Sequence, residues 1–233
     1  MPLLFSAALE FKVDQILSAF ENGTTEVQYC YIENIHDGRG YTAGKAGFTS
    51  ATGDLYEFVK RYRGALEKYL PELKRIADAE SSETSGLRGF VKDYRSECKG
   101  KAFELAQDSL VDDMYKKPAR EYLKKLHLKT PLAYLIIYDT IIQHGDGDDP
   151  DSLSGILGRM KPSEDEMSFL YSFLEEREQV LLHATDPATR VEWKKSVDRV
   201  YALRSLLDQK NFDLNDVTIK VWGETFPIRS SEF

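Results

Sequence analysis

Residues 132–143 constrain the fold more than any other part of this chain, because they are apolar nearly all round and directly follow Pro131. Proline fits the first turn of a helix, and a helix that is apolar on every side has to be buried. The segment therefore predicts a central helix around which other elements pack. Asp139 lies inside it and needs a partner, since an isolated buried carboxylate is strongly destabilising. Two arginines on later predicted helices, Arg177 and Arg190, are the candidate partners.

Helical periodicity extends over most of the chain. Apolar residues spaced three and four positions apart form stripes that start at Leu9, Leu55, Leu66, Leu87 and Phe103. Each stripe is typical of a helix with one core-facing side. The first helix is expected to stop at the Asn-Gly pair of residues 22–23.

Local signals mark the starts of further helices. Pro118 falls where a first helical turn tolerates proline, and Asp186 precedes another proline of this kind. Residues 163–166, Ser-Glu-Asp-Glu, match a capping box before the apolar stripe that begins at Phe169.

Strands are expected in two places. Residues 27–35 and 41–49 are β-branched, aromatic or small polar with loose alternation, and a glycine-rich turn at residues 37–40 separates them. Residues 217–228 leave the helical period and favour a short extended segment. The fold class is therefore mainly helical with a small sheet. Because no proline- or serine-rich linker is present, we expect one domain over residues 1–233, built as two lobes around a cleft.

The charge balance bears on the partner. With 39 acidic and 31 basic side chains the formal net charge is −8, which disfavours nucleic acid or an anionic membrane and suits a cationic ligand. No apolar run is long enough to span a bilayer, and the start lacks the basic region of a signal peptide. A mature secreted chain and a cytoplasmic protein would look alike in this respect.

We predict neither a metal site nor a cofactor. Cys30 and Cys98 lack the clustered spacing of a zinc site, and two unpaired thiols are the favoured expectation. The acidic loop of residues 144–151 fails the calcium-loop template, because Pro150 falls where a ligand should be and no closing glutamate follows. A loop that ends in a helix cap at Asp151 or Ser152 is the simpler interpretation. The other histidines, His36, His127 and His183, show no metal spacing.

Glu21 and Asp37 are the candidate reactive pair. Glu21 lies one turn beyond Leu17 on the apolar ridge of the first helix, so its carboxyl is expected to be partly desolvated and to retain a proton. Asp37 opens a polar glycine turn, where a carboxylate stays ionised and can act on water. A glycosidase needs one carboxyl of each kind. The alternative is that neither residue is catalytic: Glu21 would be a charge at a helix end, and Asp37 would only stabilise the turn.

Four segments of the chain form a recognisable set. They are residues 21–25 (Glu-Asn-Gly-Thr-Thr), 37–42 (Asp-Gly-Arg-Gly-Tyr-Thr), 51–54 (Ala-Thr-Gly-Asp) and 138–145 (Tyr-Asp-Thr-Ile-Ile-Gln-His-Gly). In this order they resemble the bacterial chitosanases of glycoside hydrolase family 46. The resemblance implies an endo-acting, inverting hydrolase of the β-1,4 bonds of chitosan with a lysozyme-like fold: two mostly helical lobes and a small antiparallel sheet beside the cleft. It also implies a secreted monomer whose partners are chitosan and glucosamine oligosaccharides.

The resemblance implies roles for individual residues as well. Glu21 matches the general acid, Asp37 the general base, and Thr42 the residue that helps to hold the attacking water. The positions that match sugar-contacting ones are Asn22, Tyr31, Arg39, Gly47, Asp54, His144 and Gly145. Asp139, Arg177 and Arg190 match a buried ion network that tunes the acid, and Asp54 and Glu33 are expected to pair with cationic amino groups.

Two other functions stay open at this point. One is a lysozyme-like hydrolase of chitin or peptidoglycan, which a preference for acetylated polymer would reveal. The other is a sugar-binding protein without catalysis, against which the intact pair of Glu21 and Asp37 already argues.

Overall fold

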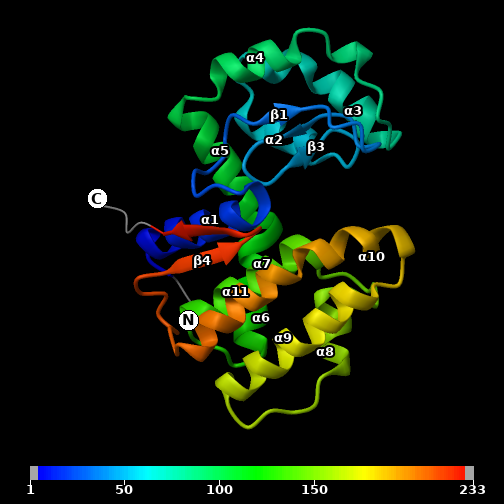
Figure 1. The fold of residues 1–233 in the computed structure, drawn as a ribbon. Coiled ribbons are helices and arrows are strands. Elements are labelled where there is room, and N and C mark those ends of the chain that lie inside the picture. The colour runs from blue at the N-terminus through cyan, green and yellow to red at the C-terminus, as the bar shows by residue number, and fades with distance from the viewer. Residues whose placement is uncertain (1–4, 229–233) are drawn as a thin grey trace. The chain divides into compact units, whose positions relative to one another are not determined.

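The computed structural model describes residues 5–228, and the chain divides into two compact units (Figure 1). The discontinuous unit joins residues 5–26 to residues 115–228, and the continuous unit is residues 27–114. The first four residues, which belong to the segment examined for a signal peptide, lie outside the described range.

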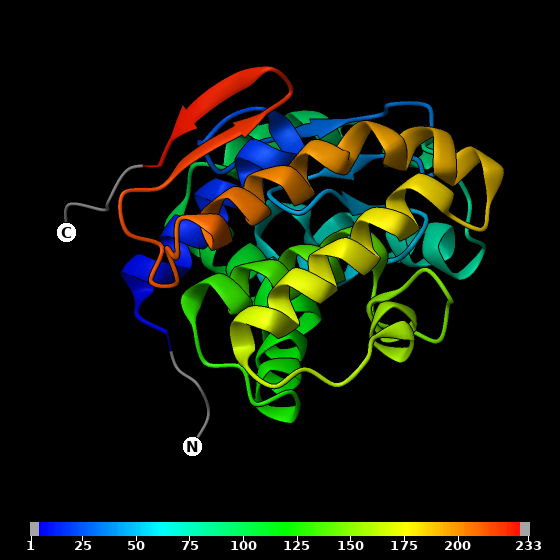
Figure 2. The same ribbon diagram turned by 60° about the horizontal axis from the view of Figure 1, so that its bottom comes forward.

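The discontinuous unit consists of helices and a β-hairpin over its described residues. Its elements are α1 (Ala7–Asn22), α6 (Lys117–Lys125), α7 (Pro131–His144), α8 (Leu153–Arg159), α9 (Glu166–His183), α10 (Pro187–Trp193), the 3-10 turn η4 (Lys194–Ser196), α11 (Val197–Asp208), β4 (Thr218–Val221) and β5 (Glu224–Pro227). Figure 2 shows α9 and α11 running side by side. The hairpin confirms the extended segment expected near residues 217–228.

Helix α7 is the centre of this unit, as its apolar sequence predicts. Residues 132–141 are at most 3% exposed, and α1, α6, α8 and α11 pack around the helix. Pro131 occupies its first turn, and the hydroxyl of Thr130 accepts a hydrogen bond from the amide of Ala133 as the N-cap. Among residues 5–228, no helix combines the length and the apolar character that crossing a membrane requires.

One helix start differs from the expected capping box. Asp165, and not Ser163, caps α9 by accepting a hydrogen bond from the amide of Ser168. The Glu166 carboxylate accepts hydrogen bonds from the amide and the hydroxyl of Thr130, at 3.0 and 2.7 Å. Glu166 therefore ties the start of α9 to the start of α7 and does not close a box with Ser163.

The continuous unit combines a small sheet with short helices. Its elements are β1 (Ile32–Glu33), β2 (Thr42–Ala43), β3 (Phe48–Thr49), α2 (Asp54–Tyr62), η1 (Gly64–Tyr69), α3 (Leu70–Asp78), η2 (Ser85–Leu87), α4 (Phe90–Glu97) and α5 (Lys101–Val111). A π-helical turn, Asp112–Lys116, follows α5 and crosses into the discontinuous unit. The core is aromatic, with the Phe58 ring lying 4.9 to 6.0 Å from the rings of Phe48, Tyr94 and Phe103.

The sheet is smaller than the pattern predicts. The three strands are antiparallel in the order β1-β2-β3, with Thr42 paired to Glu33 on one side and to Thr49 on the other. The expected second strand, residues 41–49, is itself folded into a hairpin, because Gly44 and Gly47 turn the chain at φ values of 73° and 64°. Glycine adopts this left-handed backbone without steric cost. The mainly helical fold with a small antiparallel sheet is confirmed.

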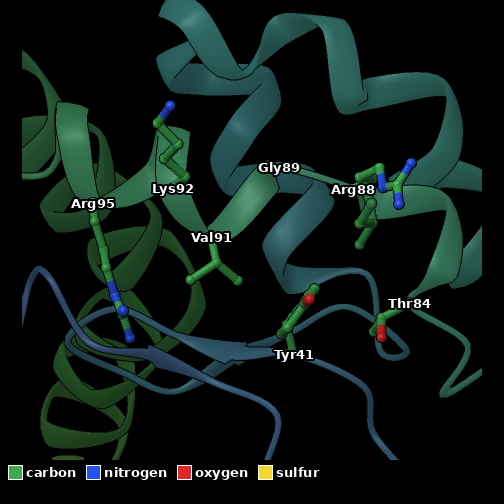
Figure 3. A pocket seen from close by; sticks show the side chains of 8 residues that line it. Tyr41, Thr84, Arg88, Gly89, Val91, Lys92 and Arg95 are labelled. Atoms are coloured by element: carbon green, nitrogen blue, oxygen red, sulfur yellow. The ribbon is translucent and has the colours of Figure 1, made fainter.

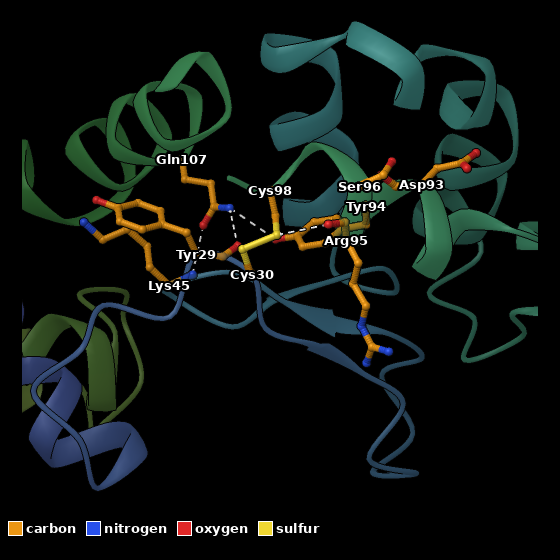
Figure 4. The surroundings of a disulfide bond; sticks show 9 residues. All are labelled: Tyr29, Cys30, Lys45, Asp93, Tyr94, Arg95, Ser96, Cys98 and Gln107. Carbon is orange, nitrogen blue, oxygen red and sulfur yellow. Dashed lines mark hydrogen bonds between the residues drawn. A yellow bond between two sulfur atoms is a disulfide. The ribbon is translucent and has the colours of Figure 1, made fainter. Parts of the chain in front are cut away.

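The two cysteines form a disulfide, which corrects the expectation of two unpaired thiols. The bond joins Cys30, just before β1, to Cys98 at the end of α4 (Figure 4). Beside it, the Gln107 side chain donates a hydrogen bond to the carbonyl of Tyr29 and accepts one from the amide of Lys45, each at 2.9 Å. A covalent bond and a buried amide thus fix the chain that leads into the sheet.

Candidate functional site

The two candidate carboxyl groups belong to different units, so each is described with its own neighbours. Glu21 lies in the last turn of α1 in the discontinuous unit. Asp37 lies in the loop between β1 and β2 in the continuous unit.

Glu21 sits at the end of a well-terminated helix. Gly23 has φ 61° and its amide donates to the carbonyl of Ala19, so the helix stops where the sequence predicts. Val13 and Leu17, on the ridge below, are buried, but the Glu21 side chain is 42% exposed. The apolar ridge therefore ends before Glu21, and its carboxylate is held by an ion pair in place of apolar contact.

A buried ion network stands behind Glu21. Nη2 of Arg199 lies 2.7 Å from Oε1 of Glu21 and 2.5 Å from Oδ1 of Asp139. The other oxygen of Asp139 lies 2.6 Å from Nη2 of Arg177, and the Asp139 and Arg177 side chains are fully buried. Burial alone would raise the pKa of the Asp139 carboxyl, but the charges of Arg199 and Arg177 and their hydrogen bonds lower that pKa below its ordinary value. Two carboxylates and two guanidinium groups balance one another, which is how a protein tolerates buried charge.

The second guanidinium on Asp139 comes from Arg199, which corrects the expectation for Arg190. In the structure Nε of Arg190 donates a hydrogen bond to the carbonyl of Ala184, 2.8 Å away at the end of α9. Arg199 does have a signal in the sequence, because it lies four positions before Leu203 on the apolar stripe of α11. An arginine on a core-facing stripe needs a buried carboxylate.

His144 extends the network from the C-terminal end of α7. Its Nδ1 lies 2.9 Å from the carbonyl of Asp151 and its Nε2 lies 3.3 Å from Nε of Arg177. A carbonyl accepts and a guanidinium donates, so the ring is neutral with its proton on Nδ1. Burial, followed by the charge of Arg177, lowers the pKa of His144 to about 3. The Trp193 ring covers the imidazole at a centroid distance of 4.5 Å.

Asp37 is held locally by Arg39. Oδ1 of Asp37 accepts a hydrogen bond from the Arg39 amide at 3.0 Å, and Oδ2 accepts one from Nε of the same arginine at 2.8 Å. Nη2 of Arg39 forms an ion pair with Oδ2 at 2.6 Å. Partial burial would raise the pKa of Asp37, but the hydrogen bonds and the charge of Arg39 lower it below its ordinary value. Asp37 is therefore ionised at neutral pH. Both side chains remain accessible, at 26% and 54% exposed.

The loop around Asp37 packs closely on Ser50. A Cβ atom on Gly40 would lie 2.2 Å from the hydroxyl of Ser50, which explains why this position requires glycine. The same hydroxyl accepts from the amide of Tyr41 and donates to the carbonyl of Arg39. Thr42, one residue further on, is buried, and among the described residues no group hydrogen-bonds its Oγ1.

Asp54 opens α2 at the end of a chain of hydroxyls. Thr52 donates to its carboxylate at 2.9 Å, and the hydroxyls of Thr49 and Thr52 are 2.7 Å apart. Burial raises the pKa of Asp54 against the opposing effects of the Thr52 hydrogen bond and the charge of Arg39. A carboxylate in this position is weakly hydrated and gains from a cationic partner.

The remaining expected sugar-contact residues fall in both units. Tyr31 is exposed in the continuous unit, and its hydroxyl lies 3.4 Å from the carboxylate of Glu33. In the same unit, the Gly47 amide donates to the carbonyl of Gly44 at 3.2 Å. In the discontinuous unit, Asn22 is exposed at the end of α1, and Gly145 ends α7 with φ 69° and ψ 177°, a backbone conformation that favours glycine.

Within residues 5–228, no three histidine, cysteine, aspartate or glutamate side chains gather closely enough to ligate a metal ion.

Comparison with known proteins gives a consistent result. The model of glycosyl hydrolase family 46 matches residues 15–217. A chitosanase of Bacillus subtilis strain 168 is 46% identical over 217 residues, which are 88% of this chain and 78% of that protein.

Solved structures agree with the sequence match. The native chitosanase of Bacillus subtilis MY002 superposes with a TM-score of 0.86 at 42% identity, over 97% of this chain and all of that one. A mutant of the same enzyme, complexed with six glucosamine units, gives the same TM-score at 41% identity over the same shares of the two chains. The chain therefore belongs to glycosyl hydrolase family 46, as its four motifs predict.

Proposed function

We propose that this protein is an inverting endo-chitosanase that hydrolyses β-1,4 bonds in partly deacetylated chitosan. The observation that carries the proposal is the likeness, over 97% of the chain, to a chitosanase whose mutant was solved with six glucosamine units. The net charge of −8 agrees with a cationic substrate.

Glu21 is the proposed general acid, which protonates the oxygen of the leaving sugar. Its accessible carboxyl suits this role, since a proton donor has to reach the bond that breaks. Arg199 orients the carboxyl, and Asp139 shares the charge of Arg199, so Glu21 does not face an uncompensated cation. Arg177 in turn supports Asp139, which makes Arg199, Asp139 and Arg177 positioning residues for the acid.

Asp37 is the proposed general base. Its ionised carboxylate can take a proton from water. Oδ1 accepts one hydrogen bond from Arg39, which leaves it a second lone pair for that water. The unpaired hydroxyl of Thr42 suits a second contact to the same water. Attack on the anomeric carbon from the face opposite the leaving group inverts its configuration, which requires carboxyl groups roughly 6.5 to 9.5 Å apart in the productive complex.

Asp54 and Glu33 are proposed to pair with the amino groups of the substrate, beside Tyr31, Arg39 and Gly47. Asn22, Gly145 and His144, in the discontinuous unit, are proposed as further sugar contacts. The neutral His144 ring has partners on both nitrogens, and through Nε2 it also helps to position Arg177.

Two substitutions test the acid and the base. Glu21→Gln and Asp37→Asn should each lower chitosan turnover by orders of magnitude and leave the circular dichroism spectrum and the melting temperature close to those of the wild type. Glu121→Gln and Asp148→Asn are the matched controls, because both residues are exposed and lie outside these networks. Near-normal activity in either test variant contradicts the assignment.

The substrate and the stereochemistry need separate measurements. Release of reducing ends from polymers of graded acetylation should be greatest for highly deacetylated chitosan; a preference for chitin or peptidoglycan would favour a lysozyme-like activity. Proton NMR during the first minutes of hydrolysis should show the α-anomer as the initial product. An initial β-anomer contradicts inversion.

The protein is proposed to work as a secreted monomer. A disulfide such as Cys30–Cys98 is typical of proteins that mature in an oxidising compartment. Fractionation of producing cells checks the location, and light scattering of the purified protein checks the monomer.

A further inference from the structure

A pocket in the continuous unit is lined by cationic side chains, although the chain as a whole is acidic. It measures about 550 Å³ and is lined by Tyr41, Thr84, Leu87, Arg88, Gly89, Val91, Lys92 and Arg95. Three of these residues are cationic and none is acidic, although the chain as a whole has a net charge of −8. Glucosamine units would be repelled here, so the pocket does not suit the proposed substrate.

The cationic groups of the pocket keep most of their hydrogen-bond donors available for a ligand. Within residues 5–228, neither Arg88 nor Lys92 forms an ion pair, and both are exposed. Arg95 donates one hydrogen bond, from Nη2 to the carbonyl of Ile32 at 3.2 Å, and keeps its other donors. Like charges gathered around one cavity repel each other, and an anionic ligand would relieve that repulsion.

The shape of the pocket favours a ring-shaped ligand with acidic groups. Figure 3 shows Arg88 and Arg95 on either side of Val91, with Tyr41 below, while the Lys92 ammonium points away from Tyr41. The Tyr41 ring packs on Phe90 at a centroid distance of 6.2 Å, which fixes it as part of the floor. Tyr41 and Thr84 add hydroxyl groups next to the apolar Leu87 and Val91.

We propose that this pocket binds an acidic oligosaccharide that carries carboxylate groups. Guanidinium groups match carboxylates with two parallel hydrogen bonds, and an aromatic ring beside aliphatic side chains fits the C–H face of a sugar. Inorganic phosphate would meet the cations but fill a small part of the cavity. The proposed substrate is a polycation, so acidic polysaccharides would associate with it through opposite charge. This association with the substrate rests on the proposed function.

Calorimetric titration of the full chain with tetragalacturonate at low salt tests the proposal without any catalytic readout. The wild type should bind, and the affinity should fall as sodium chloride is added. Arg88→Gln should weaken binding by about tenfold, and the double variant with Arg95→Gln should weaken it further. Lys92→Gln should have a smaller effect, because its ammonium points away from the floor of the pocket.

The control is Lys124→Gln with Lys125→Gln, which removes the same charge from the exposed face of α6 in the other unit. This control should bind like the wild type. Because Arg95 also bonds to Ile32, the Arg88 variant decides the outcome if the double variant is unstable. The proposal is overturned if the wild type does not bind tetragalacturonate, or if Arg88→Gln binds it equally well. It is also overturned if phosphate or a glucosamine tetramer binds the wild type as tightly as tetragalacturonate does and loses the same affinity in Arg88→Gln. A wild type that cleaves chitosan but ignores tetragalacturonate would sink this inference and leave the proposed function intact.

Discussion

The proposed acid and the proposed base are held by opposite means. Glu21 depends on Arg199, 178 residues later in the chain, and through it on Asp139 and Arg177 in the core of the discontinuous unit. Asp37 depends on Arg39, two residues away in an exposed loop of the continuous unit. The surroundings of the proposed acid are therefore part of the fold, whereas those of the proposed base are local. Substitutions around the acid should therefore damage stability and activity together, and substitutions around the base should separate the two.

The largest effect is expected from Arg199→Gln. The change leaves the fully buried Asp139 with one cation in place of two, and breaking a buried charge pair costs about 3 to 5 kcal/mol of unfolding free energy. Urea unfolding measures this loss. Arg204→Gln on the same helix is the matched control, since its partially exposed pair with Glu178 should contribute under about 1 kcal/mol. Equal losses in the two variants would contradict a special role for the network.

A somewhat smaller effect is expected when the disulfide is removed. Cys30→Ser with Cys98→Ser frees a loop whose ends are 68 residues apart, which should lower the unfolding free energy by about 2 to 5 kcal/mol. Hydrogen exchange should speed up in residues 27–114 and stay slow in α7. A reducing agent acting on the wild type should reproduce the shift, and no shift under either treatment would count against a stabilising bond.

The next effect is a dependence of stability on pH through His144. Its pKa is lowered to about 3 in the folded protein from about 6.5 in the unfolded chain. Between these values the unfolded chain binds the extra proton, so stability falls on acidification by up to about 1.4 kcal/mol per pH unit. His144→Gln, whose amide can both donate and accept, should remove this slope. His183→Gln, at an exposed position, should preserve it; equal slopes in wild type and His144→Gln would refute the assignment.

The smallest change in stability is expected from Arg39→Gln, below about 1 kcal/mol, because the pair with Asp37 is accessible to water. Its effect on activity should be clearer. Without Arg39 the pKa of Asp37 rises toward its ordinary value, so the base becomes protonated at a higher pH. The acidic limb of the kcat/KM profile should therefore move to higher pH. Arg61→Gln is the exposed control and should leave the profile unchanged. If the acidic limb does not move in Arg39→Gln, Arg39 does not control the protonation of Asp37.

The difference between local and long-range contacts also explains which features the sequence predicts. The end of α1 at Gly23, the buried α7 and the Asp37 turn follow from residues within a few positions of one another. The second arginine on Asp139 does not, because it lies 60 residues further along the chain. Its position four residues before Leu203 on the apolar stripe of α11 indicates that Arg199 is buried, but it does not identify the carboxylate that Arg199 meets.

Two further features escaped prediction for related reasons. The disulfide joins residues 68 positions apart, and two cysteines carry no local pattern that reveals pairing. The break in the strand of residues 41–49 did have a local cause in Gly44 and Gly47, yet β-branched and aromatic neighbours concealed it. The family itself was predicted correctly from the four motifs together.

The 178 residues that separate Glu21 from Arg199 have a consequence for the order in which parts of the protein can form during synthesis. The continuous unit, with its disulfide and the Asp37 loop, is complete in sequence once residue 114 has been synthesised. Domains generally fold as units during synthesis, starting from the N-terminal side. The salt bridge on Glu21 has to wait for α11, close to the end of the chain. A nascent chain that stops before α11 would therefore contain the whole Asp37 loop but lack Arg199, the partner of Glu21.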